Sequence, residues 1–569
     1  MLIIDSTKQD LLVHAQSSVG PIPTAFDPEG VYPYPSFCET ADRPHLRSFQ
    51  GVVLENDWMR AEILPELGGK LYSLRDKTTG CETLFKEPIV RPARILPRMA
   101  FISGGLEVSF PISHTPSQIE QVHVETRICD GRVYCFCGER ERRFGMQWTL
   151  EFSLGENDRY LTQRLRIRNP SERPHLWMSW SNAAVPARSD TNLHFPSGSV
   201  LSHSDIVIEL DWETQGPKTQ SDISRMTGYF WHRPDVYAFG VFTPSLGSGL
   251  YHIADPKMAP GIKLWSYGMG DHRRWSHVST LSCECYLEIQ GGPIADQSMK
   301  CELKPGEELC FQEFWIPTST PLDIHRIELP NPKLLPVTDM PLFSWPLVPY
   351  IQAWRQLIAE SHTDMHQQAW SDNWAPSGMD DLGPALERLY AREETALRSF
   401  CAFQLGAWFA GRDAVDHALF WLARSTDDRA FALAARLHRF CRKDATTAVR
   451  WFGFIRSEPF ALHPQVVVER DLALAMIGAT TLHERQTWLD RVVASSDESI
   501  VERRAQLAFD QGRPQEALKY LMSQPFQLVH QRYVRSDLLR SIVGSGAVIP
   551  ESLGEDDLAR WGAYREYQE

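Results

Sequence analysis

The pattern of hydrophobic and polar residues changes once along the chain, and each pattern predicts its own kind of structure. From about residue 51 to residue 317, short runs alternate apolar with polar side chains, as over residues 161–168 and 236–242. Turn sequences such as Asp130-Gly131 separate these runs. A period of two is typical of β-strands, and many short strands without helices between them predict a large antiparallel β-sandwich.

The second pattern is helical and begins at about residue 382, where Ala and Leu recur at intervals of three and four. Turn positions at 411, 443, 478 and 512 lie 32, 35 and 34 residues apart, which is close to the tetratricopeptide period. Ala448 and Ala517 occupy the same offset after their turns. We therefore expect an all-α, tetratricopeptide-like repeat domain. Such an array either offers a protein-binding groove or oligomer contact, or buttresses the β domain.

Prolines crowd the stretch between the two patterns and predict an extended connector along the surface, because proline interrupts regular helix. The expected organisation is an N-terminal extension over residues 1–50 wrapped on the sandwich, the sandwich over 51–317, the connector over 318–381 and the repeats over 382–569. The prolines are Pro317, Pro321, Pro330, Pro332, Pro336, Pro341, Pro346 and Pro349.

One stretch of the sandwich, residues 102–114, has the composition of a site. Gly104 and Gly105 permit backbone angles that side chains forbid and a close approach of a ligand to the main chain. The residues that follow alternate, so Glu107 points to the face opposite Leu106 on a strand. A pocket carboxylate is one interpretation, and a solvated Glu beside a turn is the other.

Composition narrows the class of protein. The chain has 569 residues with 43% hydrophobic content, so two or more domains are expected. With 58 basic and 72 acidic residues the net charge is −14, and the basic residues form no cluster. We therefore do not expect nucleic acid as a partner. The start of the sequence has no signal-peptide pattern and no long apolar run occurs, so we expect a cytoplasmic protein without a membrane partner. The 11 cysteines form no CxxC pair, and no zinc spacing or phosphate loop predicts a metal or cofactor.

Several segments resemble the galactose mutarotase (aldose 1-epimerase) family. Residues 260–268, followed by Cys285-Tyr-Leu-Glu-Ile-Gln-Gly-Gly-Pro, are similar to the last part of that family, whose Glu in the second motif is the catalytic base. Glu288 takes that place here. Residues 64–76 resemble the opening strand pair, and Arg168-Asn-Pro with Trp180-Ser-Asn resembles the central strand. Ala183 stands where a mutarotase has its catalytic acid His, which puts the usual proton route in doubt.

The whole chain is similar to a bacterial family that joins a mutarotase-like β domain to tetratricopeptide repeats. Its densest matching parts are residues 104–114, 138–148 and 180–185. The resemblance implies a galactose mutarotase-like antiparallel β supersandwich with a carbohydrate substrate bound in its concave sheet. Fold transfers across such a resemblance more securely than activity does.

Two carboxylates on well-separated strands, Glu107 and Glu288, are the candidate catalytic pair. Glycosidic cleavage needs one protonated carboxyl for the leaving oxygen and one ionised carboxylate to activate water or attack carbon. We expect a glycoside hydrolase of a small oligosaccharide or glycoside, with Glu288 as base or nucleophile and Glu107 as acid, or the reverse.

Further residues are candidates for substrate binding. His114 would share a proton with Glu107 or hold a hydroxyl, Arg142 would bind a hydroxyl or an anionic group, and tryptophans would stack on a sugar face. A structural His, an Arg paired between strands and tryptophans in the core are the alternatives. The set is His114, Arg142, Asn182, Trp231, Trp265, Arg273, Trp275 and Gln290.

Two other functions stay open. One is a sugar mutarotase or epimerase in which Glu107 or His114 replaces the missing acid. The other is a sugar-binding module without catalysis that signals through its repeats, by a protein partner or a second copy of the chain.

Overall fold

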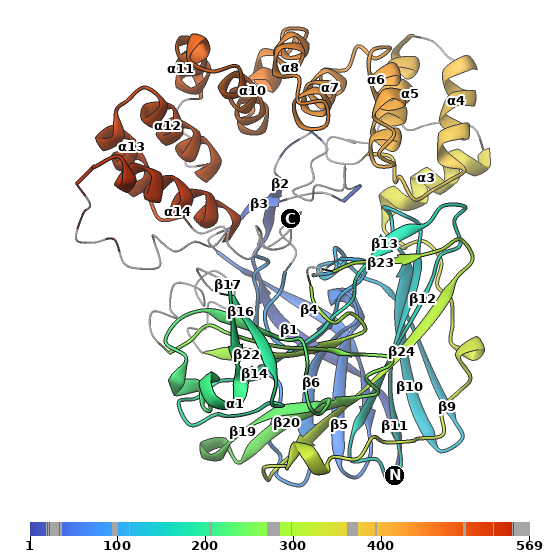
Figure 1. Cartoon of the computed structure of the whole chain (residues 1–569). Helices are drawn as coiled ribbons and strands as arrows, with labels where there is room; N and C mark the ends of the chain where they lie inside the picture. The colour runs from blue at the N-terminus through green and yellow to red at the C-terminus, as the bar shows by residue number, and fades with distance from the viewer. Residues whose placement is uncertain are drawn as a thin grey trace.

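A computed structural model provides the three-dimensional structure. It describes residues 1–18, 37–41, 43–93, 101–112, 114–203, 207–269, 285–297, 299–360, 374–392, 395–492, 497–526 and 529–548, with residues 20, 22, 33, 34, 550 and 553. Two large β-sheets form one part, and the helices form an arch above them (Figure 1). The change from a period of two to a helical period in the sequence is therefore confirmed as a change of architecture.

The larger sheet has twelve strands among the described residues and carries the candidate site. Its neighbours are antiparallel apart from the β1–β7 pair. In spatial order the strands are β17 (Val207–Asp211), β16 (Ser199–His203), β18 (Thr227–Trp231), β21 (Gly261–Ser266), β22 (Tyr286–Gly292), β14 (Ser181–Pro186), β8 (Leu106–Val108), β6 (Lys70–Asp76), β5 (Met59–Leu64), β4 (His45–Glu55), β1 (Ile3–Val13) and β7 (Ile89–Val90).

The second sheet has eight strands in the described part of the chain, and two short strand pairs lie outside both sheets. The order is β15 (Asn192–His194), β19 (Ala238–Thr243), β20 (Ser248–Ala254), β24 (Glu308–Thr318), β12 (Leu161–Arg168), β11 (Gln147–Gly155), β10 (Arg132–Arg140) and β9 (His123–Cys129). The short pairs are β13 (His175–Trp177) with β23 (Cys301–Leu303) and β2 (Gln16–Ser18) with β3 (Phe37–Thr40).

The main hydrophobic core joins the two sheets and follows the alternation of each strand. In β8, Leu106 and Val108 belong to this core, and in β22 Leu287 and Ile289 do. Because successive side chains of a strand point to opposite faces, the residues between them face away from the core. We call this the outer face of the twelve-stranded sheet. The antiparallel sandwich predicted from the sequence is confirmed by this arrangement.

The N-terminal extension predicted over residues 1–50 is in part an integral element of the sheet. Strand β1 pairs with β4 along its whole length, from Ile3 opposite Glu55 to Val13 opposite His45. The expectation of a segment wrapped on the sandwich is therefore corrected for these residues. Their alternation is weak because β1 lies near the sheet edge, with side chains that are mostly half-buried or exposed.

The proline-rich connector crosses the eight-stranded sheet mostly in irregular form, with two short 3-10 helices, η4 (Ile324–Arg326) and η5 (Val337–Asp339). Its carbonyl groups accept hydrogen bonds from side chains of successive strands: Arg164 Nη1 donates to Leu335 at 2.8 Å and Gln147 Nε2 to Phe343 at 2.9 Å. Helical structure then begins at Pro349, within the stretch expected to be connector. That boundary is corrected, because proline is tolerated in the first turn of a helix.

The helices pack mainly as antiparallel neighbours in hairpins, and the described ones run along the arch in chain order (Figure 1). They are α3 (Pro349–Glu360), α4 (Leu382–Arg392), α5 (Thr395–Ala410), α6 (Val415–Leu422), α7 (Asp428–Phe440), α8 (Ala445–Phe452), α9 (Glu458–Ala461), α10 (Pro464–Ile477), α11 (Leu482–Arg491), α12 (Glu498–Asp510), α13 (Pro514–Met522) and α14 (Val529–Gly544).

The four turn positions counted in the sequence each precede the second helix of a hairpin. Gly512 and Gly478 have positive φ angles of 75° and 102°, and Lys443 takes the same left-handed region at 54°. The small residues that follow are fully buried: Ala448 lies against α7 and Ala517 against α12. The period therefore marks real hairpins, because a tight turn and a small residue are what close packing of two helices requires.

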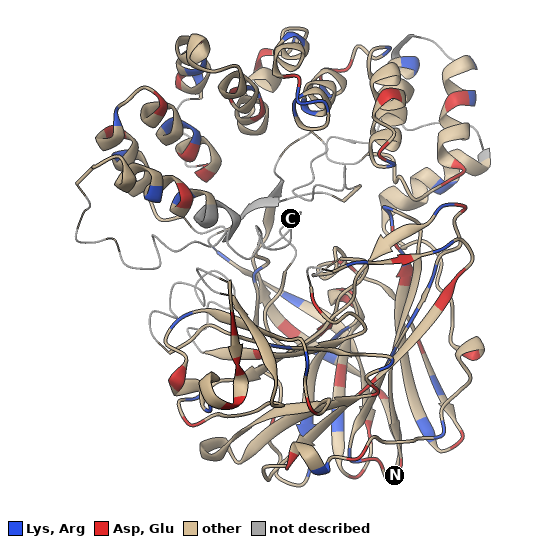
Figure 2. Cartoon of the chain, viewed as in Figure 1, with Lys and Arg blue, Asp and Glu red and all other residues tan. Residues whose placement is uncertain are grey.

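The helical part touches the β part through backbone and side-chain hydrogen bonds. Gly378 N–H donates to Arg142 O at 2.8 Å, and Ser377 Oγ to Arg143 O at 2.7 Å. Both signs of charge are scattered over strands and helices (Figure 2). No described helix is long and apolar enough to cross a membrane, and the cysteines of the described residues are free thiols.

Candidate functional site

Polar residues from four neighbouring strands meet on the outer face of the twelve-stranded sheet. In one row across the strands, Glu107 of β8 lies opposite Asn182 of β14, Asn182 opposite Gln290 of β22, and Gln290 opposite Lys263 of β21. In the next row, Ala184 lies opposite Glu288. The core residues of these strands occupy the alternate positions, so the sequence period itself sends this set to one face.

Glu107 is a buried carboxylate with both oxygens engaged. The residue is 4% exposed, Oε1 accepts from the Thr115 N–H at 2.9 Å, and Oε2 lies 3.1 Å from His114 Nδ1. Burial by itself would raise the pKa of Glu107, but the charge and hydrogen bond of His114, together with Lys70 and the Thr115 N–H, hold it below its ordinary value. Glu107 is therefore ionised at neutral pH.

His114 sits on the loop that follows β8 and is more accessible than its partner. Its side chain is 18% exposed, against 4% for Glu107. The backbone is left-handed, with φ of 58°, a region that non-glycine residues adopt only where the surroundings compensate the strain. Its ring meets the Phe101 ring edge-on at 4.7 Å. Because an ionised Glu107 only accepts hydrogen bonds, Nδ1 is the donor to it, which leaves Nε2 for another partner.

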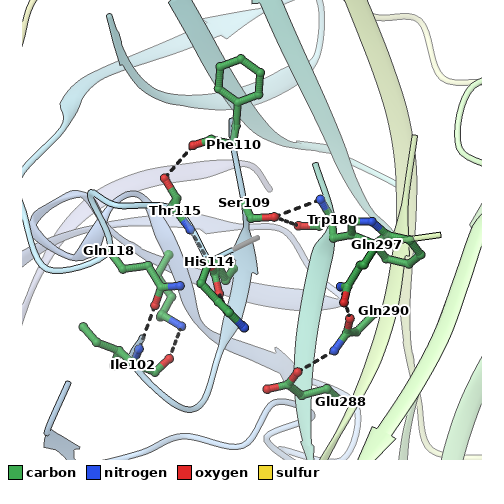
Figure 3. Close-up of polar contacts among 12 residues, drawn as sticks. Ile102, Ser109, Phe110, His114, Thr115, Gln118, Trp180, Glu288, Gln290 and Gln297 are labelled. Carbon is green, nitrogen blue, oxygen red and sulfur yellow. Dashed lines mark hydrogen bonds and ion pairs between the residues drawn. The ribbon is translucent and has the colours of Figure 1, made fainter. Parts of the chain in front are cut away.

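Glu288 is the second carboxyl of the site. Gln290 Nε2 donates to its Oε2 at 2.7 Å, and Gln290 Oε1 in turn accepts from Gln297 Nε2 at 3.0 Å (Figure 3). Burial raises the pKa of Glu288, His114 and Lys263 oppose that rise, and the charge of Glu107 adds to it. Glu288 therefore holds its proton more strongly than an ordinary carboxyl does.

Two buried lysines accompany the carboxyls. Lys70 Nζ donates to the carbonyls of Ile102 and Gly104 at 2.9 and 2.8 Å, which fixes the loop before β8. Lys263 Nζ donates to Gln297 Oε1 at 2.7 Å. Burial lowers the pKa of Lys263 to about 8, against the attraction of Glu288 and Asp296. The lysines offset the two carboxylate charges and brace the site from both sides.

The two glycines of the candidate stretch are required by the fold. Gly104 and Gly105 have φ angles of 79° and 66°, and an added Cβ would lie 2.7 Å from Phe85 O and 2.6 Å from Leu71 O. The close approach that the sequence suggested is therefore to neighbouring protein backbone.

An unsatisfied amide and a group of aromatic rings complete the outer face. Asn182 is 4% exposed, and neither its Oδ1 nor its Nδ2 has a hydrogen-bond partner among the described residues. Buried polar groups are nearly always hydrogen-bonded, so this amide is free to bind a polar group of a ligand. The rings pack together beside Glu288 and Ala184; they are Phe85, Phe101, Trp265, Tyr267 and Tyr286.

The structure groups some of the predicted site residues and separates others. Glu107, Glu288, His114, Asn182 and Gln290 lie together on the outer face. Their catalytic and binding roles stay predictions. Trp265 lies opposite Glu288 and packs edge-on against Tyr267 at 4.6 Å, so it belongs to the same face.

Trp231 and Arg142 do not fit their predicted roles. Trp231 is a core residue, with its ring stacked on Phe195 at 4.8 Å and its indole N–H bonded to Pro196 O at 2.9 Å, so it is unavailable for stacking on a sugar. Arg142 is completely buried and binds Glu120 and Tyr350, which corrects its assignment as a substrate ligand in favour of an ion pair. Arg273 and Trp275 lie outside the described residues.

Sequence reasoning missed Lys70, Lys263 and the two tyrosines. In β21, Lys263 and Trp265 alternate with core residues. This alternation could have predicted that Lys263 shares a face with Trp265. Lys70 had no such signal, since its role depends on the loop that passes over it. Within the described residues, no group of His, Cys, Asp and Glu has the arrangement of a metal site.

Comparisons with known proteins agree with the two-part architecture. The sequence model of the family described as "Domain of unknown function (DUF5107)" matches residues 26–318, more than half of the 569-residue chain, and a model of a C-terminal domain matches residues 352–542. A TPR-domain containing protein from Parabacteroides distasonis is 44% identical, with 98% of each chain covered and a TM-score of 0.92.

Two more distant similarities each cover about half of the chain. A galactose mutarotase-like protein from Clostridium acetobutylicum is 12% identical over 47% of this chain and 95% of its own, with a TM-score of 0.36. A galactose mutarotase related enzyme from Lactobacillus acidophilus is 13% identical over 48% and 99%, with a TM-score of 0.35. The match over residues 26–318 and the similarity along the whole chain show that the protein belongs to the DUF5107 family.

Proposed function

We propose that the outer-face site transfers protons at the anomeric centre of a sugar, so that the chain acts as an aldose epimerase-type isomerase. The observation that carries this proposal is the pairing of an accessible His114 with the ionised Glu107, near a protonation-prone Glu288. Ala183 stands where a mutarotase has its catalytic acid His. In this proposal His114, from another segment, takes over that role.

His114 suits the role of acid, and Glu107 the role of a positioning residue. Both oxygens of Glu107 already accept hydrogen bonds from protein, so the carboxylate is poorly placed to contact a substrate. Its charge lies where it stabilises an imidazolium and fixes the ring orientation, as carboxylates do beside catalytic histidines. His114 Nε2 is then the atom that gives a proton to the ring oxygen of the sugar.

Glu288 suits the role of base. Its raised pKa brings it nearer to neutrality, where a general base works best, and Gln290 fixes its orientation. Interconversion of anomers takes a proton from the C1 hydroxyl and returns one to the ring oxygen, so Glu288 and His114 are sufficient for both transfers. The Asn182 amide and the rings around Trp265 would bind hydroxyls and an apolar sugar face.

A glycoside hydrolase is the second candidate, because the pKa values of Glu107 and Glu288 are displaced in opposite directions. Such a pair supplies an acid and an ionised carboxylate. On this mechanism Glu288 is the acid and Glu107 the base or nucleophile, which is the second of the two assignments that the sequence left open.

One panel of measurements separates the two reactions. Anomer exchange of reducing sugars is followed by magnetisation-transfer NMR, and hydrolysis by release of aryl alcohol from activated glycosides. The proposal predicts exchange without hydrolysis, and a loss of about 10²–10⁴-fold in His114→Gln, the range for one acid–base group. Glu209→Gln, an exposed carboxylate on β17 of the same sheet, is the matched control. Hydrolysis that Glu107→Gln abolishes would favour the hydrolase instead.

A further inference from the structure

A residue of the N-terminal segment is buried inside the helical arch, far along the chain from its contacts. Ile22 is completely inaccessible to solvent. It packs in a cluster whose other members come from α7, α8 and α10. Most of these side chains are small; they are Ala432, Ala435, Ala448, Phe452, Val466 and Ala473.

The main chain of Ile22 is recognised as well as its side chain. Gln465, at the start of α10, accepts from the Ile22 N–H through Oε1 at 2.9 Å and donates from Nε2 to the Ile22 carbonyl at 2.9 Å. A carboxamide that bonds both backbone groups of one residue recognises the main chain of the peptide directly. Gln465 is itself buried, so water competes little for these bonds.

The residue two positions before Ile22 is restricted to glycine. Gly20 has a φ of 137°, and an added Cβ would lie 2.4 Å from His463 Cε1 and 2.7 Å from Gln465 Oε1. In the sequence, Ile22 stands between Pro21 and Pro23. Because both prolines lack an N–H, Ile22 supplies the only backbone donor of this tripeptide.

We propose that α7, α8 and α10 form a binding site for a peptide of sequence Gly-x-Ile, which the chain's own Gly20 and Ile22 occupy in cis. The small side chains of the three helices accept one aliphatic side chain, and the Gln465 amide, which we call the clamp, bonds its backbone. The close approach of His463 and Gln465 excludes any residue but glycine two positions earlier. The proposal is independent of the reaction on the outer face.

Occupancy in cis has a measurable consequence. A tethered segment competes at an effective concentration that reaches the millimolar range for short flexible linkers, so a separate peptide binds the wild-type chain weakly. Removing the internal competitor exposes the same site to a peptide in solution.

The test uses the full chain and a fluorescent peptide with the sequence of residues 16–27. Fluorescence anisotropy is expected to give a Kd for Ile22→Asp at least tenfold below that for wild type. Ile22→Asp with Gln465→Ala loses this binding, whereas Ile22→Asp with Gln506→Ala, a half-buried glutamine on α12, keeps it. A peptide in which the isoleucine is replaced by aspartate does not bind. Equal affinity of wild type and Ile22→Asp, or binding that survives Gln465→Ala, would overturn the proposal.

A second measurement does not require the Ile22 variant to fold. In hydrogen exchange, the Ile22 amide of wild type is expected to be protected, and Gln465→Ala is expected to remove that protection while α7 and α8 keep theirs. An Ile22 amide that exchanges equally fast in both proteins would contradict the clamp.

Discussion

Replacing Glu139 by Gln is expected to stabilise the protein at neutral pH. Glu139, in β10, is 1% exposed. Burial raises its pKa from 4.5 to about 8, Arg142 opposes the rise, and the charges of Glu120 and Glu141 add to it. Between these two values the folded chain keeps a proton that the unfolded chain releases. Stability of the wild type therefore falls as the pH rises from 4.5 to 8, and a neutral Gln removes this loss.

The magnitude follows from the same pKa values. A pH of 7 is about 2.5 units above the ordinary pKa of 4.5. At 1.36 kcal/mol per unit, ionisation of Glu139 stabilises the unfolded state relative to the folded state by about 3 kcal/mol. Urea unfolding at several pH values measures the gap in stability between Glu139→Gln and wild type. The gap is expected to be small near pH 5 and to grow to about 3 kcal/mol near pH 7.

The control is Glu125→Gln, a half-exposed carboxylate that pairs with Arg127 on the neighbouring strand β9. It gives the effect of the same Glu→Gln change at a carboxylate that is not fully buried. A gap for Glu139→Gln that does not change between pH 5 and pH 8 would refute the reasoning, because it would mean that Glu139 titrates alike in the folded and unfolded chain.

Two further predictions concern the framework of the site. Gly105→Ala is expected to destabilise the chain by more than about 1 kcal/mol in thermal unfolding, because its Cβ would meet a backbone oxygen at 2.6 Å; Gly131→Ala, left-handed but without a neighbour within 4 Å, should cost less. Tyr350→Phe removes a hydrogen-bond partner of the buried Arg142 and should cost about 1–3 kcal/mol, whereas Tyr390→Phe on α4 should cost less in the same assay. Equal effects within either pair would contradict these contacts.

The strands that carry the site were predictable because burial of one face imposes a period of two. Alternation alone predicts that Glu107 and Leu106 point to different faces of their strand, and likewise Glu288 and Leu287. The structure has both carboxyls on the outer face. The same reasoning could not separate a core tryptophan from a surface one. Trp231 and Trp265 both lie in strands, and only the register of each strand in the sheet decides which face its ring takes.

Contacts made by loops were beyond the sequence pattern. The sequence pattern predicted Glu288 as the catalytic partner of Glu107 and left His114 between two roles, whereas the hydrogen bond at 3.1 Å joins Glu107 to His114. That bond depends on the left-handed turn at His114, which no periodicity reveals. The burial of Ile22 among helices more than 400 residues away is of the same kind, since Gln465 lies 443 positions along the chain.

The most direct test of the proposed function is the rate of anomer exchange of a reducing sugar, measured by magnetisation-transfer NMR with wild type and with Glu288→Gln. Proton transfer by Glu288 predicts that wild type accelerates exchange and that the variant, folded as judged by its unfolding transition, loses about 10²-fold or more of this rate. Exchange by Glu288→Gln at the wild-type rate would contradict the account.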